Sequence, residues 1–183
     1  MIVMLGWGSL IWDPRDLAPM LSGDWNSDGP MLPVEYCRQS RDGRLTLALL
    51  NDATPVRVLW SKTNTNNLAA AKSKLALREG CPSKYICILS NPDSNPFGIG
   101  DWMREIGASG AVWTGLPPKF CGQNGIAPTA AQAVDHLRTL KDSARLQAEK
   151  YIRMTPPQIR TAYRRVFEEQ FGWFPSDSCH APK

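Results

Sequence analysis

The chain has 183 residues, of which 43% are hydrophobic and 21% are charged. This is the composition of a folded domain of ordinary size, and it excludes a disordered chain. The net charge of +4 is mild and the basic residues are spread along the chain, unlike the dense basic stripe of a nucleic-acid-binding protein. No apolar run could span a membrane, and the N-terminus has neither the basic leader nor the cleavage site of a signal peptide. We therefore expect a cytoplasmic protein that binds neither nucleic acid nor a membrane.

Strand-forming runs dominate the first two thirds of the chain. They are expected at 1–5, 34–41, 44–50, 56–60, 85–89 and 111–114. Asp42 and Gly43, between the second and third runs, are a strong hairpin signal. A helical turn is expected at 15–21, followed by a polar loop at 22–33.

One helix interrupts these strands. It is expected to begin at Thr65 or Asn66, either of which can cap it, and to run to Leu77. Gly80 then stands where a left-handed residue commonly ends a helix.

Loops and helices make up the rest of the chain. A loop is expected at 91–100, a short helix capped by Asp101 follows, and 115–127 reads as an ordered loop or lid. In the last third, Thr155 is placed as a helix cap and Gly172 as a stop. Helical patterns run over 129–140, 143–153 and 157–171. Strands followed by helices predict an α+β protein. We expect a single domain over 1–183, with a core at about 1–127 and a helical extension at 128–175 that packs on it.

Cysteine usage predicts reduced thiols, because the number is odd, no CxxC pair occurs and no export signal is visible. The cysteines are Cys37, Cys81, Cys87, Cys121 and Cys179. The only histidines are His136 and His180, so we expect no metal site. Cys81 or Cys121 beside His136 would form a nucleophilic pair, although a chain with this many cysteines always contains some such pair.

The most informative stretch is 6–12, which reads Gly-Trp-Gly-Ser-Leu-Ile-Trp directly after the first expected strand. Glycine lets the backbone turn sharply and lets a ligand approach it closely. The amides of Gly8, Ser9 and Leu10 could then form a small anion-binding nest, and a tight turn without a ligand is the alternative. The stretch is not the dinucleotide-binding fingerprint, because no third glycine follows and Pro14 interrupts the helix that it would need.

This stretch resembles the YGSL/YGSN loop of the γ-glutamylcyclotransferase superfamily, and its Gly-Ser-Leu-Ile-Trp part is similar to the version in the glutathione-degrading branch. Arg-Glu-Gly at 78–80 with Tyr85 shortly after it is similar to the family's acidic segment. Arg38 and Ser40, followed by 43–47, are similar to the family's R-x-S…T-L strand pair. The resemblance covers about the first half of the chain. It implies a small mixed β-barrel with flanking helices, to which this chain adds a helical C-terminal third.

The resemblance also implies an activity that needs no metal or cofactor. A γ-glutamyl amide or peptide cyclises to 5-oxoproline and releases its amine, with Glu79 as general acid/base. One carboxylate can perform both proton transfers of such a reaction, and a solvent-facing glutamate at a helix end is the alternative for Glu79. The substrate-binding residues that the resemblance implies are Trp7, Gly8, Ser9, Leu10 and Tyr85.

Two departures from the family pattern leave a second class of function open. Trp7 stands where the family has a tyrosine, and an indole can donate a hydrogen bond but cannot accept one. The segment 113–120 and the helices from 128 onward match neither main branch of the family. The alternative function is a catalytically inactive homologue that binds a small anionic or γ-glutamyl ligand, or that acts as a protein-interaction module.

Overall fold

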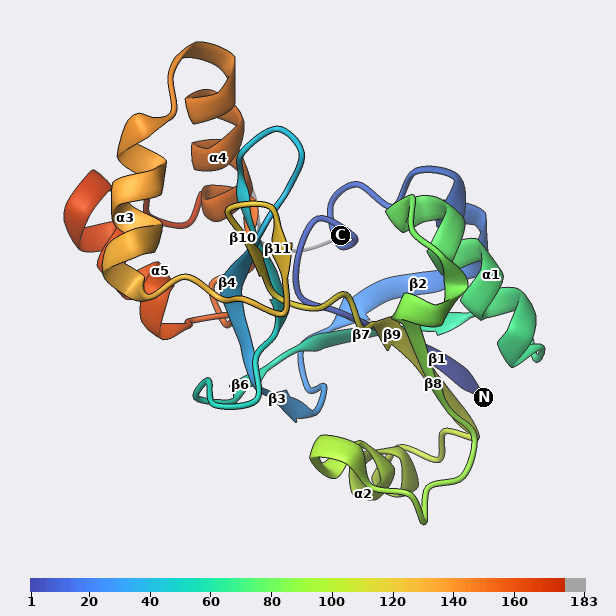
Figure 1. Cartoon of the computed structure of the whole chain (residues 1–183). Coiled ribbons are helices and arrows are strands. Elements are labelled where there is room, and N and C mark those ends of the chain that lie inside the picture. The colour runs from blue at the N-terminus through green and yellow to red at the C-terminus, as the bar shows by residue number, and fades with distance from the viewer. Residues whose placement is uncertain (177–183) are drawn as a thin grey trace.

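The structure is a computed structural model that describes residues 1–176. It is a mixed α+β arrangement (Figure 1), which confirms the predicted class. The strands are β1 (Ile2–Gly6), β2 (Leu21–Asn26), β3 (Met31–Leu32), β4 (Val34–Gln39), β5 (Leu45–Leu49), β6 (Val56–Arg57), β7 (Leu59–Thr63), β8 (Ile86–Leu89), β9 (Gly110–Thr114), β10 (Lys119–Phe120) and β11 (Gln123–Asn124). The helices are α1 (Leu68–Glu79), α2 (Ile99–Glu105), α3 (Ala130–Thr139), α4 (Asp142–Met154) and α5 (Ala162–Phe171), with short 3-10 turns η1 (Arg15–Met20), η2 (Ser83–Tyr85) and η3 (Pro96–Gly98).

The strands form three separate sheets. The largest has the order β2-β7-β1-β9-β8, with β1 antiparallel to β7 and parallel to β9. A second sheet has the order β11-β10-β4-β5, and β3 pairs with β6 alone. No strand pairing among residues 1–176 closes these sheets into a barrel, so the expected β-barrel is wrong. The two larger sheets are joined by side chains of one shared hydrophobic cluster instead of by a backbone ladder.

Strand β1 is the centre of the larger sheet and is buried on both faces. Ile2 and Met4 belong to the cluster under α1, whereas Val3 and Leu5 belong to the main core. This alternation follows from the two-residue repeat of a strand. The continuous apolar run at the start of the chain therefore corresponds to a fully buried strand, as predicted.

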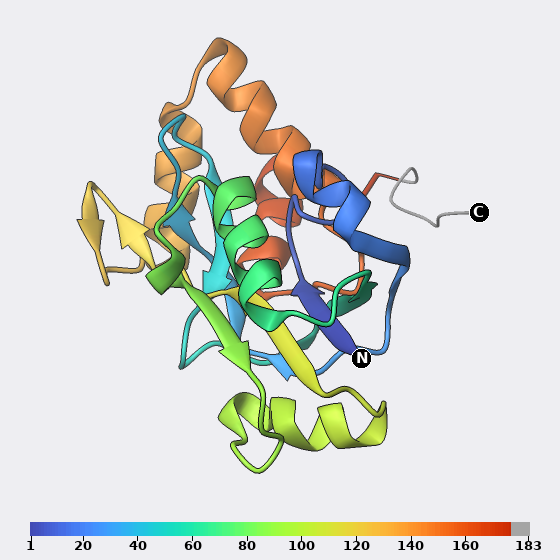
Figure 2. The ribbon, with the colours of Figure 1, turned by 90° about the vertical axis from the view of Figure 1, so that its right-hand side faces the viewer.

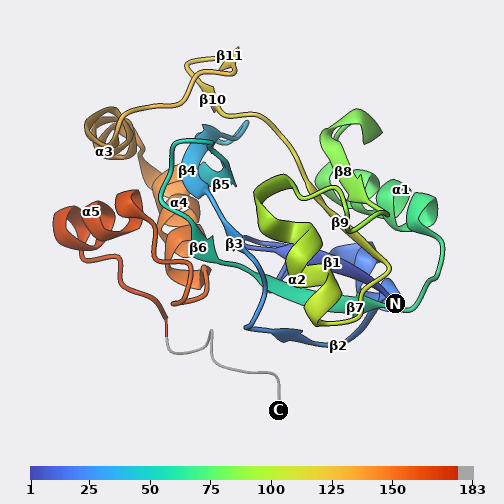
Figure 3. The ribbon, with the colours of Figure 1, turned by 90° about the horizontal axis from the view of Figure 1, so that it is seen from below.

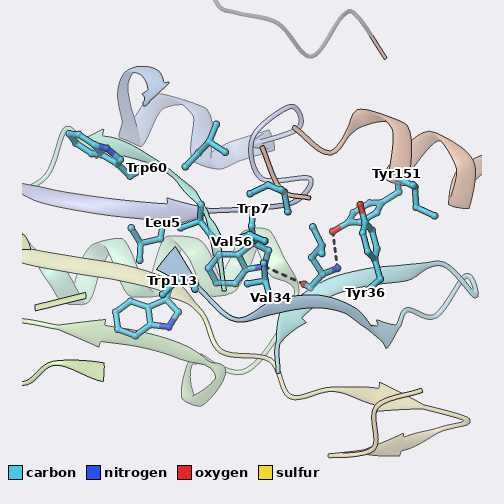
Figure 4. Close-up of a cluster of buried hydrophobic side chains, with 14 of the residues drawn as sticks. Leu5, Trp7, Val34, Tyr36, Val56, Trp60, Trp113 and Tyr151 are labelled. Carbon is cyan, nitrogen blue, oxygen red and sulfur yellow. Dashed lines mark hydrogen bonds between the residues drawn. The ribbon is translucent and has the colours of Figure 1, made fainter. Parts of the chain in front are cut away.

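The molecule has two halves that meet at the main core (Figure 4). In one half, α1 and α2 lie on opposite sides of the five-stranded sheet (Figure 1). In the other half, α3, α4 and α5 gather beside β4 and β5. Seen from below, the C-terminal helices lie on one side and α1 with the larger sheet on the other (Figure 3). Seen from the side of α1, the C-terminal helices lie behind the strands (Figure 2).

Helix α5 is fixed to β4 by a buried carboxylate. Glu35 accepts hydrogen bonds from the Thr161 hydroxyl at 2.5 Å and from the Tyr163 amide at 3.2 Å. Burial raises the pKa of the Glu35 carboxyl, and these hydrogen bonds oppose the rise. Phe167 of α5 packs edge-on against Tyr36 of β4, with 5.4 Å between ring centroids. The helical C-terminal third is thus part of the main core.

The helix boundaries differ from the prediction in three places. Helix α1 is capped by Asn67, whose side chain accepts from the Ala70 amide, and it extends to Glu79. Gly98, not Asp101, stands at the N-cap of α2. Helix α5 is capped by Thr161. Thr155 is instead the C-cap of α4, where its hydroxyl donates back to the Tyr151 carbonyl at 3.0 Å.

Some strands were also missed. The segment expected as a polar loop contains β2 and β3, and the run at 56–60 is divided between β6 and β7. Strand β2 is an exposed edge strand whose side chains are mostly solvent-facing, so its polar sequence reads as a loop. The expected loop at 115–127 contains the small β10–β11 hairpin.

No helix among residues 1–176 has the length and apolar character needed to cross a membrane. Cys179 and His180 lie outside the described residues. Cys37, Cys81, Cys87 and Cys121 are free cysteines.

Candidate active site

A cavity of about 320 Å³ lies where the two halves of the molecule meet. Its wall combines the loop after β1, the end of α1, the β4–β5 hairpin and one residue of α4. Of the predicted site residues, five line it, and they are Trp7, Gly8, Ser9, Leu10 and Glu79. Arg38, Ser40 and Thr46 of the R-x-S…T-L pattern also line it. Tyr85 does not line the cavity. Its carbonyl accepts from the Gly115 amide at 2.7 Å, and its ring lies near the ammonium of Lys84.

The glycines of the loop are needed for space. Neither Gly6 nor Gly8 has a positive φ, so the sharp-turn reason for them does not apply. A Cβ at Gly6 would lie 2.6 Å from the ring of Trp25, and a Cβ at Gly8 would overlap the hydroxyl of Tyr151. Each glycine therefore lets an aromatic side chain pack directly on the loop backbone.

The loop after β1 keeps backbone donors free. Its turns are closed by hydrogen bonds from Ile11 to the Gly8 carbonyl and from Asp13 to the Ser9 carbonyl. Within residues 1–176 the amides of Gly8, Ser9 and Leu10 themselves donate to no acceptor. Unused amides on a cavity wall can bind an anion, which is the chemistry that the sequence predicts for this loop.

The close packing on Gly8 leads to a stability prediction. Gly8→Ala is expected to lower the free energy of unfolding by about 1–3 kcal/mol, because the new methyl group collides with the Tyr151 hydroxyl. In a Tyr151→Phe background the loss should be clearly smaller, since the nearest remaining ring atom lies 3.4 Å away. Denaturant unfolding of the four proteins of this double-mutant cycle measures the coupling. Equal losses in both backgrounds would contradict the contact.

Glu79 and Arg78 connect the end of α1 to the loop. Glu79 is the last residue of α1, and Gly80 follows in the left-handed conformation with φ of 61°. The Arg78 side chain is 4% exposed, and its Nη1 donates to Glu79 Oε1 at 2.7 Å. Its Nη2 donates to Ser9 Oγ at 3.1 Å and to the Asp13 carbonyl at 2.6 Å. Arg78 thus holds the carboxylate beside the loop, although the two segments are far apart in the sequence.

Positive charge dominates the cavity wall. The arginines that line it are Arg15, Arg38, Arg41, Arg44 and Arg78, and among residues 1–176 Glu79 is its only acidic residue. Arg15 pairs with Asp13 at 3.2 Å and Arg44 with Asp42 at 2.8 Å. Arg38 donates to the Pro117 carbonyl, a neutral acceptor that does not cancel its charge. A recess lined by one sign of charge attracts ligands of the opposite sign, here anions.

Two aromatic residues bond to the main chain of Leu47 in β5. The Trp7 indole donates to the Leu47 carbonyl at 3.3 Å, and the Leu47 amide donates to the Tyr151 hydroxyl at 3.3 Å (Figure 4). The indole N–H of Trp7 is therefore used by the protein itself. Tyr151 comes from α4 and lines the cavity, and no motif in the sequence indicated this role.

The cysteine–histidine alternative has no geometry to support it. Cys81 lines the cavity, but burial raises the pKa of its thiol, and the Glu79 carboxylate adds to the rise. His136 donates from Nε2 to the Gly43 carbonyl at 2.6 Å and does not line the cavity. Cys121 is exposed. Within residues 1–176 no three His, Cys, Asp or Glu side chains gather as a metal site would require.

No known protein family, characterised protein or solved structure matches the chain. The chemistry of the cavity is inferred from the residues that line it. They are one carboxylate, free backbone amides and an excess of arginine.

Proposed function

We propose that this protein is a γ-glutamylcyclotransferase-like enzyme, which cyclises a γ-glutamyl amide or peptide to 5-oxoproline and releases the amine. One observation carries the proposal. Glu79, at the end of α1, and the Gly8–Leu10 loop, near the start of the chain, line the same cavity and are linked by Arg78. The motif order in the sequence predicts this juxtaposition. The proximity of Glu79 to the loop does not require a closed barrel, because packed side chains of the main core bring the two larger sheets together.

The reaction needs proton transfer at two nitrogens. The α-amine of the γ-glutamyl group attacks the γ-carbonyl carbon, a new C–N bond forms, and the original amide C–N bond breaks. The α-ammonium loses two protons on the way to the lactam N–H, and the leaving nitrogen gains two to depart as an ammonium, so protons balance. Glu79 takes a proton from the attacking nitrogen and returns one to the leaving nitrogen. Such a shuttle contributes about 10²–10⁴-fold to the rate.

The rest of the wall suits the anionic part of such a substrate. A γ-glutamyl compound carries an α-carboxylate, which the amides of Gly8, Ser9 and Leu10 can bind as a nest. The surrounding arginines attract it into the cavity. Anchoring the carboxylate also orients the α-amine toward the γ-carbonyl, and orientation of this kind lowers the barrier of an intramolecular reaction.

Arg41 offers a test of this electrostatic contribution. It is exposed on the cavity wall. Arg41→Gln is expected to raise KM by about 1.4- to fivefold with kcat unchanged, because an exposed charge contributes about 0.2–1 kcal/mol to binding and does so equally in the ground and transition states. Arg165→Gln, an exposed arginine of α5 outside the cavity, is the matched control. Equal KM values for the two variants would contradict the role of the arginine wall.

The activity itself is tested with a panel of γ-glutamyl compounds that includes glutathione, γ-glutamyl amino acids and γ-glutamyl amines. Mass spectrometry should detect 5-oxoproline from at least one of them, without added metal or nucleotide and in the presence of a chelator. An α-N-acetylated version of the same compound should give no product, because its nitrogen cannot attack. Absence of 5-oxoproline from the whole panel would refute the enzyme proposal.

A binding role for the same cavity is the second candidate. It is favoured by the Arg78–Glu79 ion pair at 2.7 Å, which occupies one oxygen of the Glu79 carboxylate on the cavity wall. This alternative expects thermal stabilisation of the protein by a γ-glutamyl compound with no product formed, because a ligand that binds only the native state raises its apparent stability.

A further inference from the structure

Tyr151 lines the cavity and brings a phenol hydroxyl to the Gly8 loop from a part of the chain that lies outside the motifs. The residue belongs to α4 and is buried, with 6% of its surface exposed. Its hydroxyl lies against the backbone of Gly8, where a Cβ would overlap it. The cavity wall next to the Gly8 loop is thus completed by α4.

This hydroxyl has an unused proton. It accepts one hydrogen bond, from the Leu47 amide at 3.3 Å. Among residues 1–176 it donates to no acceptor. A phenol can donate and accept at the same time, so its donor function remains available to a bound ligand. Burial raises the pKa of Tyr151 to about 12, and nearby Glu79 adds to the rise. The hydroxyl therefore keeps its proton at neutral pH and acts there only as a neutral donor.

The ring of Tyr151 is held in a fixed orientation. Trp12 packs edge-on against it with 5.5 Å between ring centroids, and Tyr36 packs edge-on at 6.3 Å. The guanidinium of Arg44 lies 5.7 Å from the ring centroid. A donor that is fixed before the substrate arrives, beside a positive charge, favours the development of negative charge near it.

We propose that Tyr151 is a further catalytic residue, whose hydroxyl donates a hydrogen bond to the γ-carbonyl oxygen of the substrate. This inference rests on the proposed function. When the α-nitrogen attacks the γ-carbon, the electron pair of the C=O bond moves to the oxygen, and the Tyr151 hydroxyl stabilises that oxyanion without transferring its proton. When the oxyanion collapses, the C=O bond reforms and the amine leaves with a proton from Glu79.

Tyr151→Phe tests this role, with Tyr36→Phe as the matched control. Both tyrosines are buried, their rings are in contact, and only Tyr151 lines the cavity. Each variant loses one buried hydroxyl. Tyr151→Phe should lower kcat by about 10²–10³-fold, the usual effect of removing one oxyanion donor. Its KM should stay within about twofold of the parent value, because the bond strengthens only in the transition state.

The control separates catalysis from packing. Tyr36→Phe should keep kcat within about twofold of the parent protein, since it only removes a hydroxyl from the core. Thermal unfolding of both variants shows whether each is folded under the assay conditions. If the parent forms 5-oxoproline and Tyr151→Phe keeps its kcat, the inference is wrong while the proposed function stands. If the parent forms none, both are wrong. Equal losses of kcat in the two variants would assign the effect to packing and also overturn the inference.

Discussion

Glu79→Gln is expected to lower kcat for 5-oxoproline formation by about 10²–10⁴-fold, because an amide cannot accept and return a proton. The change is nearly isosteric, and the amide oxygen can still accept the hydrogen bond that Arg78 Nη1 donates at 2.7 Å. Fold and ligand binding should therefore be retained. Initial rates measured by mass spectrometry, together with a thermal unfolding curve, separate lost chemistry from lost structure.

Two further variants sharpen this prediction. Glu79→Asp keeps the carboxylate but withdraws it by one methylene, so it should also lose much of kcat through poorer proton-transfer geometry. Glu105→Gln is the matched control, because Glu105 is the last residue of α2 just as Glu79 is the last residue of α1, but it is exposed and outside the cavity. If Glu79→Gln turns over substrate as fast as Glu105→Gln, Glu79 is not the proton shuttle.

Arg164→Leu is expected to lower the free energy of unfolding by about 3–5 kcal/mol, the usual cost of removing one partner from a buried charge network. Arg164 is fully buried, and its guanidinium donates to four carbonyl oxygens, one in the last turn of α4 and three in the segment that joins α4 to α5. They belong to Ile152, Thr155, Pro156 and Ile159. Its Nε also lies 3.5 Å from the carboxylate of Glu168. Leucine would leave these groups without their charged donor.

The neighbouring Arg165 provides the comparison for this prediction. It is exposed on the same helix, so Arg165→Leu should change the free energy of unfolding by no more than about 0.5 kcal/mol. Denaturant unfolding of the two variants measures the difference between a buried and an exposed arginine one residue apart. A loss below about 1 kcal/mol in Arg164→Leu would show that the carbonyl groups find other partners.

The part of the site that could be predicted depends on local signals. An apolar run followed by closely spaced glycines marks the end of β1 and its loop, and Gly80 marks the end of the helix that carries Glu79. Tyr151 could not be predicted in the same way. It lies on the buried face of α4 next to Ala148 and Ile152, where an aromatic residue reads as part of the core. Only the packing of α4 against the β4–β5 hairpin brings its hydroxyl to the cavity.

In the fold too, local features could be predicted from the sequence and long-range pairings could not. The hairpin that Asp42 and Gly43 signal depends on a local turn and was predicted correctly, since β4 and β5 pair on either side of it. The pairing of β1 with β7 and β9 joins residues that are more than fifty positions apart, and no local pattern specifies which sheets close and which stay open. The predicted β-barrel was wrong because closure of the sheets depends on these long-range pairings.

The main chain of residue 47 links two aromatic residues of the site that lie far apart in the sequence. Trp7 and Tyr151 do not bond to each other, but each bonds to the main chain of residue 47. Neither bond involves the side chain at 47, whereas loss of either aromatic partner would leave one main-chain group of residue 47 without its bond. In a set of divergent relatives, we therefore expect positions 7 and 151 to covary although their side chains do not bond to each other. The residue type at 47 need not change with them, because the connection runs through its main chain.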